Sequence, residues 1–123
     1  YSNALKITKS IEIVYGLRNF IGNANKFSKS KVFINLKSDS DVTEIIIEDD
    51  GEGYSNDVLR KIGEPYIKSY KSSIKSKSGL GLGIFIGKTL LEKNYASILC
   101  RNSKTKGGAE VNIKWKNKNL LMI

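Results

Sequence analysis

Strand-like segments occur in this sequence as two adjacent pairs, and this spacing limits the possible folds more than any other feature. The predicted strands are residues 31–37, 42–48, 96–101 and 109–115. The predicted helices are residues 7–27, 56–61 and 82–93. Adjacent strands can pair as antiparallel hairpins, so we predict an α/β two-layer sandwich, with about five strands in a mixed, mainly antiparallel sheet and about three helices on one face. The order argues against a Rossmann fold, which needs a regular alternation of strand and helix.

Apolar spacing supports these elements. The first helix has apolar residues three and four positions apart, which is the pattern of an amphipathic helix: Ile11, Val14, Leu17, Ile21 and Ala24. Ser55 precedes the short helix and is a suitable residue to cap it. Residues 64–79 are rich in Ser and Lys and contain the only proline, so we predict a mobile loop there.

The net charge of +9, from 21 Lys and Arg against 12 Asp and Glu, leaves three kinds of partner open. A nucleic acid, an acidic membrane surface and a phosphate-bearing ligand would each favour a basic protein. The lysine bias of an AT-rich genome explains the same excess without any partner, since Lys, Asn, Ile and Ser are all abundant. The charge is therefore weak support for any one function.

Histidine is absent from the 123 residues, which narrows the chemistry that the chain can perform. The commonest general base, metal ligand and phospho-acceptor of bacterial signalling is missing, so carboxylates, amides, lysines and backbone groups must carry any reaction. The single cysteine, Cys100, excludes an internal disulfide and fits a reducing compartment. Its place in a predicted strand indicates a small buried side chain rather than a redox sensor. No apolar run approaches the roughly 18 residues of a membrane span, and no signal peptide is visible.

Two asparagines, Asn19 and Asn23, stand four residues apart in the first predicted helix, so they share one face, with Lys26 about one turn further on. An amide oxygen is a suitable ligand for Mg²⁺, and a lysine ammonium suits phosphate. The alternative is a pair of solvated amides on an exposed face of the helix, and this motif alone does not decide between the two.

A second motif runs from Asp49 to Gly53 and follows the second predicted strand. Gly51 and Gly53 allow the backbone to approach a ligand closely, and a carboxylate there can accept a hydrogen bond from an exocyclic amine such as adenine N6. Guanine presents a carbonyl oxygen instead, which would leave two acceptors facing each other, so the arrangement favours adenine. An acidic hairpin or a calcium loop is the alternative, although the further ligands and distal glutamate of an EF-hand are absent.

Gly79, Gly81 and Gly83 alternate with leucines at the start of the third predicted helix. A glycine-rich turn that leads into a helix offers free backbone N–H groups and a positive dipole end to phosphate. A dinucleotide-binding fingerprint would need a strand directly before the glycines, whereas the Ser- and Lys-rich loop precedes them here.

Two other glycine motifs have simpler interpretations. Gly87 and the two residues after it resemble the end of a P-loop, but Leu82 replaces the first glycine that a P-loop needs. We interpret Gly87 as a site of packing in the middle of a helix. Gly107 and Gly108 precede the last predicted strand, and by themselves they would indicate a simple hairpin turn.

In this order, the four motifs resemble the N, G1, G2 and G3 boxes of the catalytic domain of sensor histidine kinases, within the wider group of gyrase, Hsp90, histidine kinase and MutL ATPases. Residues 62–66 resemble the F box between G1 and G2, with Gly63 and Tyr66 in place of the commoner phenylalanines. The resemblance covers residues 11–115, and within the family residues 63–66 and 88–92 look closest to the RegB/PrrB-type redox-responsive kinases of proteobacteria. It implies the Bergerat fold.

The resemblance also implies a role for each motif. Asn23 would coordinate a Mg²⁺ ion that bridges the phosphates, Asn19 would support the phosphate end, and Lys26 would contact phosphate. Asp49 would bind adenine N6, and Phe27 would pack on the base. The other residues implied at the adenine are Gly51, Gly53, Tyr54, Ile62 and Ala109, the last standing where the family often has a hydroxyl side chain. The residues implied to wrap the triphosphate, under a lid over residues 64–78, are Gly79, Leu80, Gly81, Leu82 and Gly83.

A kinase activity with ATP and Mg²⁺ follows from the same resemblance. Relatives that hydrolyse ATP have a water-activating glutamate four residues before the Mg²⁺ asparagine, and here that position is Asn19. The implied acceptor is a histidine on a separate, dimeric helical-hairpin domain of the same parent protein, with a response regulator as the next partner. Because this chain has no histidine, we expect it not to phosphorylate itself.

Ser2, Asn3 and Ala4 look like a tag scar, so residues 1–6 are expected to be a tag remnant and linker. The resemblance sets the expectations for the other domains and for location, with residues 7–118 as the catalytic domain and 119–123 as a C-terminal tail. The parent is expected to be dimeric and anchored in the inner membrane, with this part cytoplasmic and monomeric as a fragment. Three rivals stay open: a serine kinase of the anti-sigma-factor type, a nucleic-acid-binding module and a degenerate regulator. We expect no nucleic-acid partner, because the lysines of residues 68–77 stand among serines with Tyr70 as the only aromatic residue.

Overall fold

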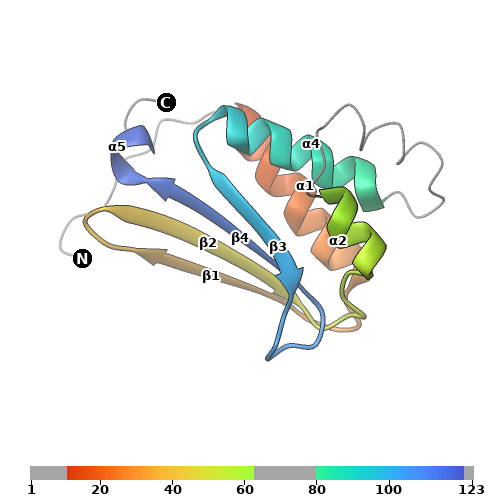
Figure 1. Cartoon of the computed structure of the whole chain (residues 1–123). Coiled ribbons are helices and arrows are strands. Elements are labelled where there is room, and N and C mark those ends of the chain that lie inside the picture. Colours follow the sequence, from red (N-terminus) through yellow and green to blue (C-terminus); the bar gives the residue numbers. More distant parts are fainter. Residues whose placement is uncertain (1–10, 63–79, 121–123) are drawn as a thin grey trace.

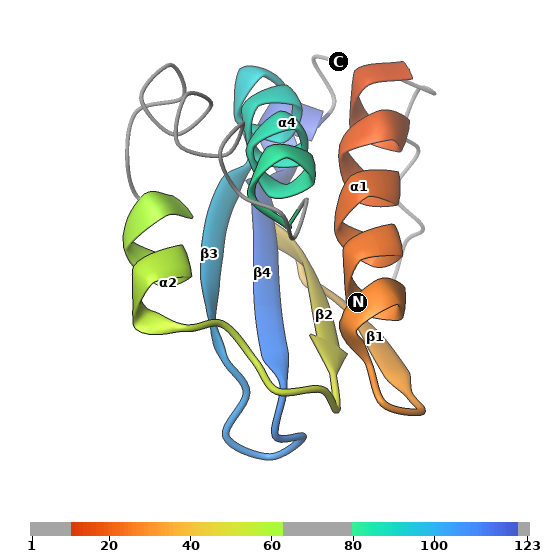
Figure 2. The same ribbon diagram turned by 90° about the vertical axis from the view of Figure 1, so that its right-hand side faces the viewer.

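The computed structural model describes residues 11–62 and 80–120, which form two layers (Figure 1). A sheet makes one layer, and α1, α2 and α4 lie on the same side of it (Figure 2). The elements in chain order are α1 (Ile11–Phe27), β1 (Val32–Ser38), β2 (Val42–Asp49), α2 (Asn56–Ile62), α4 (Leu80–Lys93), β3 (Ser97–Asn102), β4 (Ala109–Lys116) and α5 (Asn117–Leu120). The predicted α/β two-layer sandwich is confirmed.

The strands of the described sheet pair only in the antiparallel sense, in the order β1-β2-β4-β3. Each adjacent pair in the sequence forms a hairpin, as predicted. The two hairpins join through β2 and β4, where Ile45 opposes Ile113 and Ile47 opposes Val111. The described part of the chain therefore holds a 4-stranded sheet where the sequence predicted about five strands.

The face of β2 that points to the helices ends at Asp49, a predicted site residue. Side chains alternate along a strand, so Ile45, Ile47 and Asp49 lie on the same face. Ile47 is 1% exposed and belongs to the core, and Ile45 packs against it. The same alternation that builds the core thus places the Asp49 carboxylate beneath the helical layer, at the end of the sheet.

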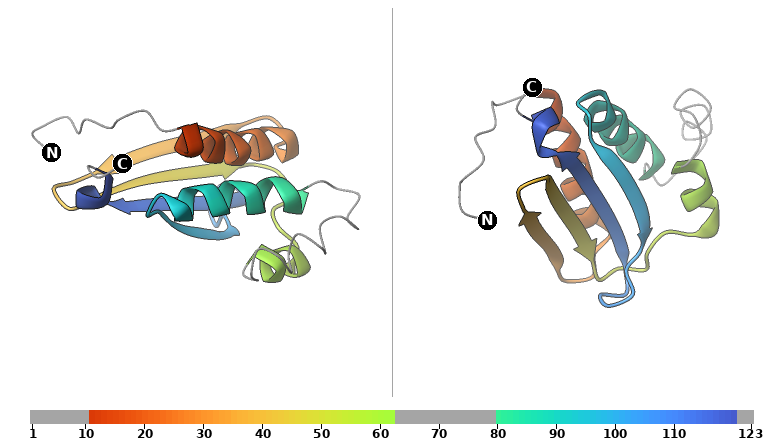
Figure 3. Two further views of the ribbon diagram at one scale, coloured as in Figure 1. Left: turned by 90° about the horizontal axis from the view of Figure 1, so that it is seen from above. Right: turned by 60° about the vertical axis from the view of Figure 1, so that its left-hand side comes forward.

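Helices α1 and α4 lie side by side over the sheet, as Figure 2 and Figure 3 show. A Cβ atom added to Gly16 would lie 2.6 Å from Leu91 Cγ, and one added to Gly87 would lie 3.0 Å from Phe20 Cε2. Both glycines therefore permit the close approach of the two helices. The interpretation of Gly87 as a site of mid-helix packing is confirmed.

The buried face of α1 differs from the apolar stripe seen in the sequence. Gly16, Phe20 and Ala24 are buried, whereas Ile11 is 71% exposed and Val14 is 37% exposed. The physical reason is the contact with α4: close approach requires Gly16 at the interface, so this side of the helix turns inward. The first apolar residues of the stripe are consequently left at the surface.

The ends of the described helices agree with the predictions to within a few residues. The Ser55 hydroxyl accepts a hydrogen bond from the Val58 amide at 3.2 Å, so the predicted cap of α2 is confirmed. Helix α4 begins at Leu80 rather than at residue 82. The first four N–H groups of a helix lack partners within it, so glycines in the first turn cost no hydrogen bond. Residues 7–10 of the first predicted helix lie outside the described residues. No helix within the described ranges is both long and apolar enough to span a bilayer.

Candidate functional site

A cavity of about 480 Å³ opens at the end of the sheet where β2 stops and β4 starts. The last turn of α1, the connection from β2 to α2, the first turn of α2 and the start of β4 form its walls. The residues that line it are Asn23, Lys26, Phe27, Lys29, Asp49, Glu52, Gly53, Tyr54, Ser55, Val58 and Ala109. The volume is in the range of sites that bind small organic ligands.

Asp49 supplies a buried carboxylate to this cavity, with only 3% of its surface exposed. Its Oδ1 atom accepts hydrogen bonds from the Gly51 amide at 2.8 Å and from the Ala109 amide at 3.2 Å. Among the residues that the structure describes, none donates a hydrogen bond to Oδ2. The protein therefore fixes the carboxylate through one oxygen and leaves the other as an acceptor for a ligand.

Two glycines make the position of Asp49 possible. A Cβ atom on Gly108 would lie 2.1 Å from Asp49 Oδ1 and 2.4 Å from the Asp49 carbonyl oxygen. A Cβ atom on Gly51 would lie 2.1 Å from the Phe27 carbonyl oxygen. Real Cβ contacts are never this short, so only glycine fits at either position. The Gly107-Gly108 turn is therefore more than a simple hairpin connection, because Gly108 packs directly on the carboxylate.

The last turns of α1 bring three predicted site residues to the cavity. Asn23, Lys26 and Phe27 all line it, and Lys26 Nζ lies 5.4 Å from the centre of the Phe27 ring. Asn19, one turn earlier, is not among the lining residues, and its side-chain amide donates to the Tyr15 carbonyl oxygen at 2.8 Å. The predicted pair of asparagines is thus split: Asn23 faces the cavity and Asn19 bonds to its own helix.

Gly53 and Tyr54, in the connection from β2 to α2, form another wall of the cavity. Gly53 has a φ of 80°, which favours glycine, and a Cβ there would lie 2.7 Å from Asn102 Oδ1. Asn102, at the end of β3, accepts from the Tyr54 amide at 2.6 Å and donates to the Tyr54 carbonyl oxygen at 3.0 Å. Burial, and after it the nearby Cys100 and Asp49, raises the pKa of the Tyr54 phenol, so Tyr54 is a neutral wall of the cavity.

The remaining predicted residues lie away from the lining of the cavity or outside the described residues. Ile62 is 5% exposed and sits in the core rather than among the lining residues. Leu80, Gly81, Leu82 and Gly83 form the first turn of α4, where backbone N–H groups have no partner within the helix. Gly79 and the predicted lid over residues 64–78 lie outside the described residues.

Sequence reasoning missed several residues of the site. Lys29, Glu52, Ser55 and Val58 line the cavity, and Asn102 holds one of its walls. Lys29 and Glu52 stand beside or inside motifs that the sequence analysis singled out, so proximity to those motifs was the available signal. Nothing local marked Asn102, since its partner Tyr54 is 48 residues away.

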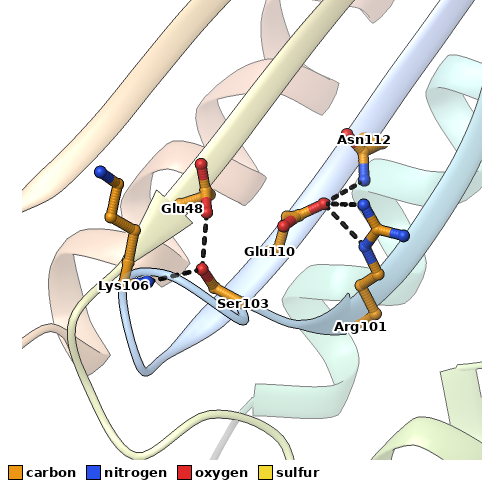
Figure 4. A network of polar contacts seen from close by, with 6 residues as sticks. All are labelled: Glu48, Arg101, Ser103, Lys106, Glu110 and Asn112. Carbon is orange, nitrogen blue, oxygen red and sulfur yellow. Dashed lines mark hydrogen bonds and ion pairs between the residues drawn. The ribbon is translucent and has the colours of Figure 1, made fainter.

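A network on the other face of the sheet fixes the β3–β4 turn that carries Gly108 (Figure 4). The Ser103 hydroxyl donates to Glu48 Oε2 at 2.6 Å and accepts from the Lys106 amide at 2.9 Å. The Ser103 amide donates to the Gly108 carbonyl oxygen at 2.7 Å. In the same network, Glu110 Oε2 forms an ion pair with Arg101 Nη2 at 2.7 Å. These hydrogen bonds stabilise the conformation of the turn in which Gly108 packs against Asp49.

Cys100 lies on β3, half-buried, next to Tyr54. Burial raises the pKa of its thiol to about 12. The thiolate is the reactive form of cysteine, so this shift disfavours reaction of Cys100 at neutral pH, and its side chain packs against the core.

Known proteins are similar to this chain in sequence and in fold. Residues 8–119 match the family described as histidine kinase-, DNA gyrase B-, and HSP90-like ATPase. The sensor histidine kinase RegB of Cereibacter sphaeroides is 39% identical over 103 residues, which are 79% of this chain and 22% of that protein. The sensor protein SrrB of Staphylococcus aureus is 31% identical over 93 residues, which are 74% of this chain and 16% of that protein. The chain thus spans about a fifth of the length of the curated relatives it matches.

A solved structure shows the same fold. The mycobacterial sensor histidine kinase MprB superposes with a TM-score of 0.67 at 22% identity, over 89% of this chain and 72% of that one. The predicted resemblance to RegB-type kinases is confirmed by the 39% identity. Sequence motifs, fold and cavity agree with the family match, and this chain belongs to the histidine kinase-, DNA gyrase B- and HSP90-like ATPases, as an ATP-binding domain of that family.

Proposed function

We propose that the cavity around Asp49 holds the adenine of Mg-ATP. The observation that carries this proposal is the single acceptor left on a buried carboxylate. Oδ1 is used by two backbone amides, so Oδ2 is the oxygen that a ligand amine can reach. Adenine N6 is such a donor, whereas guanine would bring a carbonyl oxygen to the same place and leave both acceptors unpaired.

The walls of the cavity suit a flat base. Phe27 and Tyr54 supply aromatic surface, and the small residues Gly53 and Ala109 leave room between them. Gly51 supports the site from behind, because its amide holds Asp49 Oδ1. Ile62 contributes through the core rather than by contact with the base.

The phosphates would extend from the base toward Asn23, Lys26 and the start of α4. Lys26 brings a positive charge to the cavity, and the N–H groups in the first turn of α4, which have no partner within the helix, lie at its positive end. The Asn23 amide oxygen is a fitting Mg²⁺ ligand, and phosphate oxygens and water would complete the coordination. Bound Mg²⁺ would supply charge neutralisation for phosphoryl transfer.

Asn19 gives the site no general base. An amide cannot accept a proton at neutral pH, and the Asn19 amide nitrogen is engaged with the Tyr15 carbonyl oxygen. We therefore infer slow hydrolysis of ATP and transfer of the γ-phosphoryl group to an acceptor that another domain presents. The acceptor would be a histidine on a dimerisation domain of the same parent protein, since this sequence contains 0 histidines. A response regulator would receive the group next, and the transfer would take place in the cytoplasm.

Labelled ATP tests this activity. The chain alone, incubated with γ-labelled ATP and Mg²⁺, is expected to gain no covalent label, whereas the full-length parent is expected to label itself. The label on the parent should be lost in acid, because phosphohistidine is acid-labile. An acid-stable label on the parent would instead indicate a serine kinase, and label on the isolated chain would contradict the proposal.

A further inference from the structure

Asp50 follows Asp49 directly and turns to a different part of the molecule. Its carboxylate accepts hydrogen bonds from the loop between α1 and β1. Oδ1 accepts from the amides of Lys29 at 2.8 Å, Ser30 at 3.1 Å and Lys31 at 3.2 Å. Oδ2 accepts from the Ser30 hydroxyl at 2.8 Å and, at 3.3 Å, from the Ser30 amide. One side chain thus holds three consecutive residues of the loop.

This loop begins at the residue that closes α1. Phe27 is the last residue of the helix, and the Ser28 amide still donates to the Ala24 carbonyl oxygen at 2.9 Å. On the other side, the Phe27 carbonyl packs so closely on Gly51 that an added Cβ would lie 2.1 Å away. The end of α1 is therefore fixed against the end of β2 from both sides, by contact at Gly51 and by hydrogen bonds to Asp50.

The arrangement connects the two halves of the cavity. One half is the wall from α1 and the following loop, with Phe27 and Lys29, and the other is the Asp49 carboxylate at the end of β2. Within the described residues, Asp50 is the side chain whose hydrogen bonds join these two segments. A ligand that contacts both halves needs their spacing fixed in advance, because ordering a loop on binding costs affinity.

We propose that Asp50 is a positioning residue for the nucleotide, which sets the distance between the α1 wall and Asp49 without touching the ligand itself. This inference rests on the proposed function, since it assumes that the cavity binds a nucleotide. The backbone and hydroxyl of Ser30, followed by the amides of Lys31 and Lys29, hold the pKa of Asp50 far below its usual value. Asp50 is therefore ionised throughout the neutral range.

Asp39 provides a matched control at the other end of the sheet. It too is an aspartate in a turn, and its Oδ1 accepts from the Asp41 amide at 2.7 Å and the Val42 amide at 2.8 Å. Substituting either aspartate by alanine removes charge-assisted bonds to backbone N–H groups of a turn. Of these two aspartates, only Asp50 bonds to a residue that lines the cavity, namely Lys29.

The experiment measures ATP affinity by calorimetry and thermal unfolding for the wild-type chain, Asp50→Ala, Asp50→Asn and Asp39→Ala. Asp50→Ala is expected to bind ATP at least tenfold more weakly, and Asp39→Ala within twofold of wild type, although both lower the unfolding temperature. Asp50→Asn should recover most of the affinity, because an amide oxygen can still accept from the loop and its nitrogen can donate to the Ser30 hydroxyl. Amide hydrogen exchange at Lys29 and Ser30 should accelerate in Asp50→Ala alone.

The outcomes separate the two proposals. A wild-type chain that does not bind ATP overturns the proposed function, and this inference with it. A wild-type chain that binds, with Asp50→Ala binding equally well or Asp39→Ala weakened to the same degree, overturns only the role of Asp50. If Asp50→Ala fails to fold, Asp50→Ser takes its place, and wild-type affinity in that variant also overturns the role.

Discussion

The two ends of the sheet are closed by the same kinds of side chain, yet only one end forms the cavity around Asp49. At the cavity end, Asp50 holds the loop after α1 and Asn102 holds the backbone of Tyr54. At the far end, Asp39 holds the β1–β2 turn. There Asn117 donates to the Asp39 carbonyl oxygen at 2.8 Å and accepts from the Thr43 hydroxyl at 2.7 Å.

The two ends differ in whether the hydrogen bonds leave an acceptor atom available for a ligand. At the far end, the hydrogen bonds of Asp39 and Asn117 join turn and strand residues to one another and complete the fold. At the cavity end, the same types of bond surround Asp49, whose Oδ2 has no donor within the described residues. Asp and Asn in turns stabilise loops at both ends of the sheet, whereas ligand binding at the cavity end depends on a buried residue, Asp49, one oxygen of which the loops leave unused.

The largest expected effect comes from Gly108→Ala. The new Cβ would meet the Asp49 carboxylate and backbone, and backbone atoms cannot rotate away. We expect a loss of about 3 kcal/mol in the free energy of unfolding and loss of measurable ATP binding. Urea unfolding and calorimetry check both.

Gly22→Ala is the control for that substitution. An added Cβ on Gly22 meets nothing within 4 Å, and the residue lies on the exposed side of α1. Here alanine should stabilise the helix by about 0.5–1 kcal/mol and leave ATP affinity unchanged. A Gly108→Ala variant as stable as Gly22→Ala would contradict the packing of Gly108 on Asp49.

A smaller loss of stability is expected when Asn102 or Asn117, the asparagine at each end of the sheet, is substituted. Asn102→Ala and Asn117→Ala each remove two hydrogen bonds, so each should lower the free energy of unfolding by about 1–2 kcal/mol. Only Asn102→Ala should weaken ATP binding, by about tenfold (about 1.4 kcal/mol), because its partner Tyr54 lines the cavity. Equal losses of affinity in both variants would show that stability, rather than the position of Tyr54, controls binding.

Acid is expected to lower the stability contributed by the two ends of the sheet to a similar degree, so this is the smallest of the expected effects. Backbone hydrogen bonds lower the pKa of Asp39, from Val42 first and Asp41 second, and those from Ser30 lower that of Asp50. A carboxylate whose pKa falls on folding stabilises the fold above its unfolded pKa, near 4, and that contribution is lost as the pH falls below it. Urea midpoints at pH 6, 4 and 3 should therefore decrease, and less steeply in Asp39→Asn and in Asp50→Asn. Slopes identical to wild type would refute the assigned hydrogen bonds.

The sequence was sufficient for the strand pairs and for most of the cavity, because both leave local patterns. Asn23, Lys26, Phe27, Asp49 and Gly53 were predicted and line one cavity. The orientation of α1 was not predictable from its apolar stripe, since it depends on the contact with α4. Asn19 shows a related limit: its amide donates to the Tyr15 carbonyl oxygen of its own helix, and a Cβ added to Gly87 of α4 would lie 3.2 Å from Asn19 Cβ, so spacing alone does not bring this amide to the cavity. Asn102 and Asp50 act over contacts distant in sequence, which no periodicity reveals.

The most direct test of the central claim is calorimetric titration of ATP and Mg²⁺ into the wild-type chain and Asp49→Asn. Asparagine keeps the shape of the side chain and can still accept from Gly51 and Ala109, but its nitrogen would present a donor to adenine N6. We expect wild-type binding with a preference for ATP over GTP, and an affinity for ATP at least 100-fold weaker (about 2.7 kcal/mol) in Asp49→Asn, with its unfolding temperature close to wild type. No heat with the wild-type chain, or equal ATP affinity in the variant, would contradict the account.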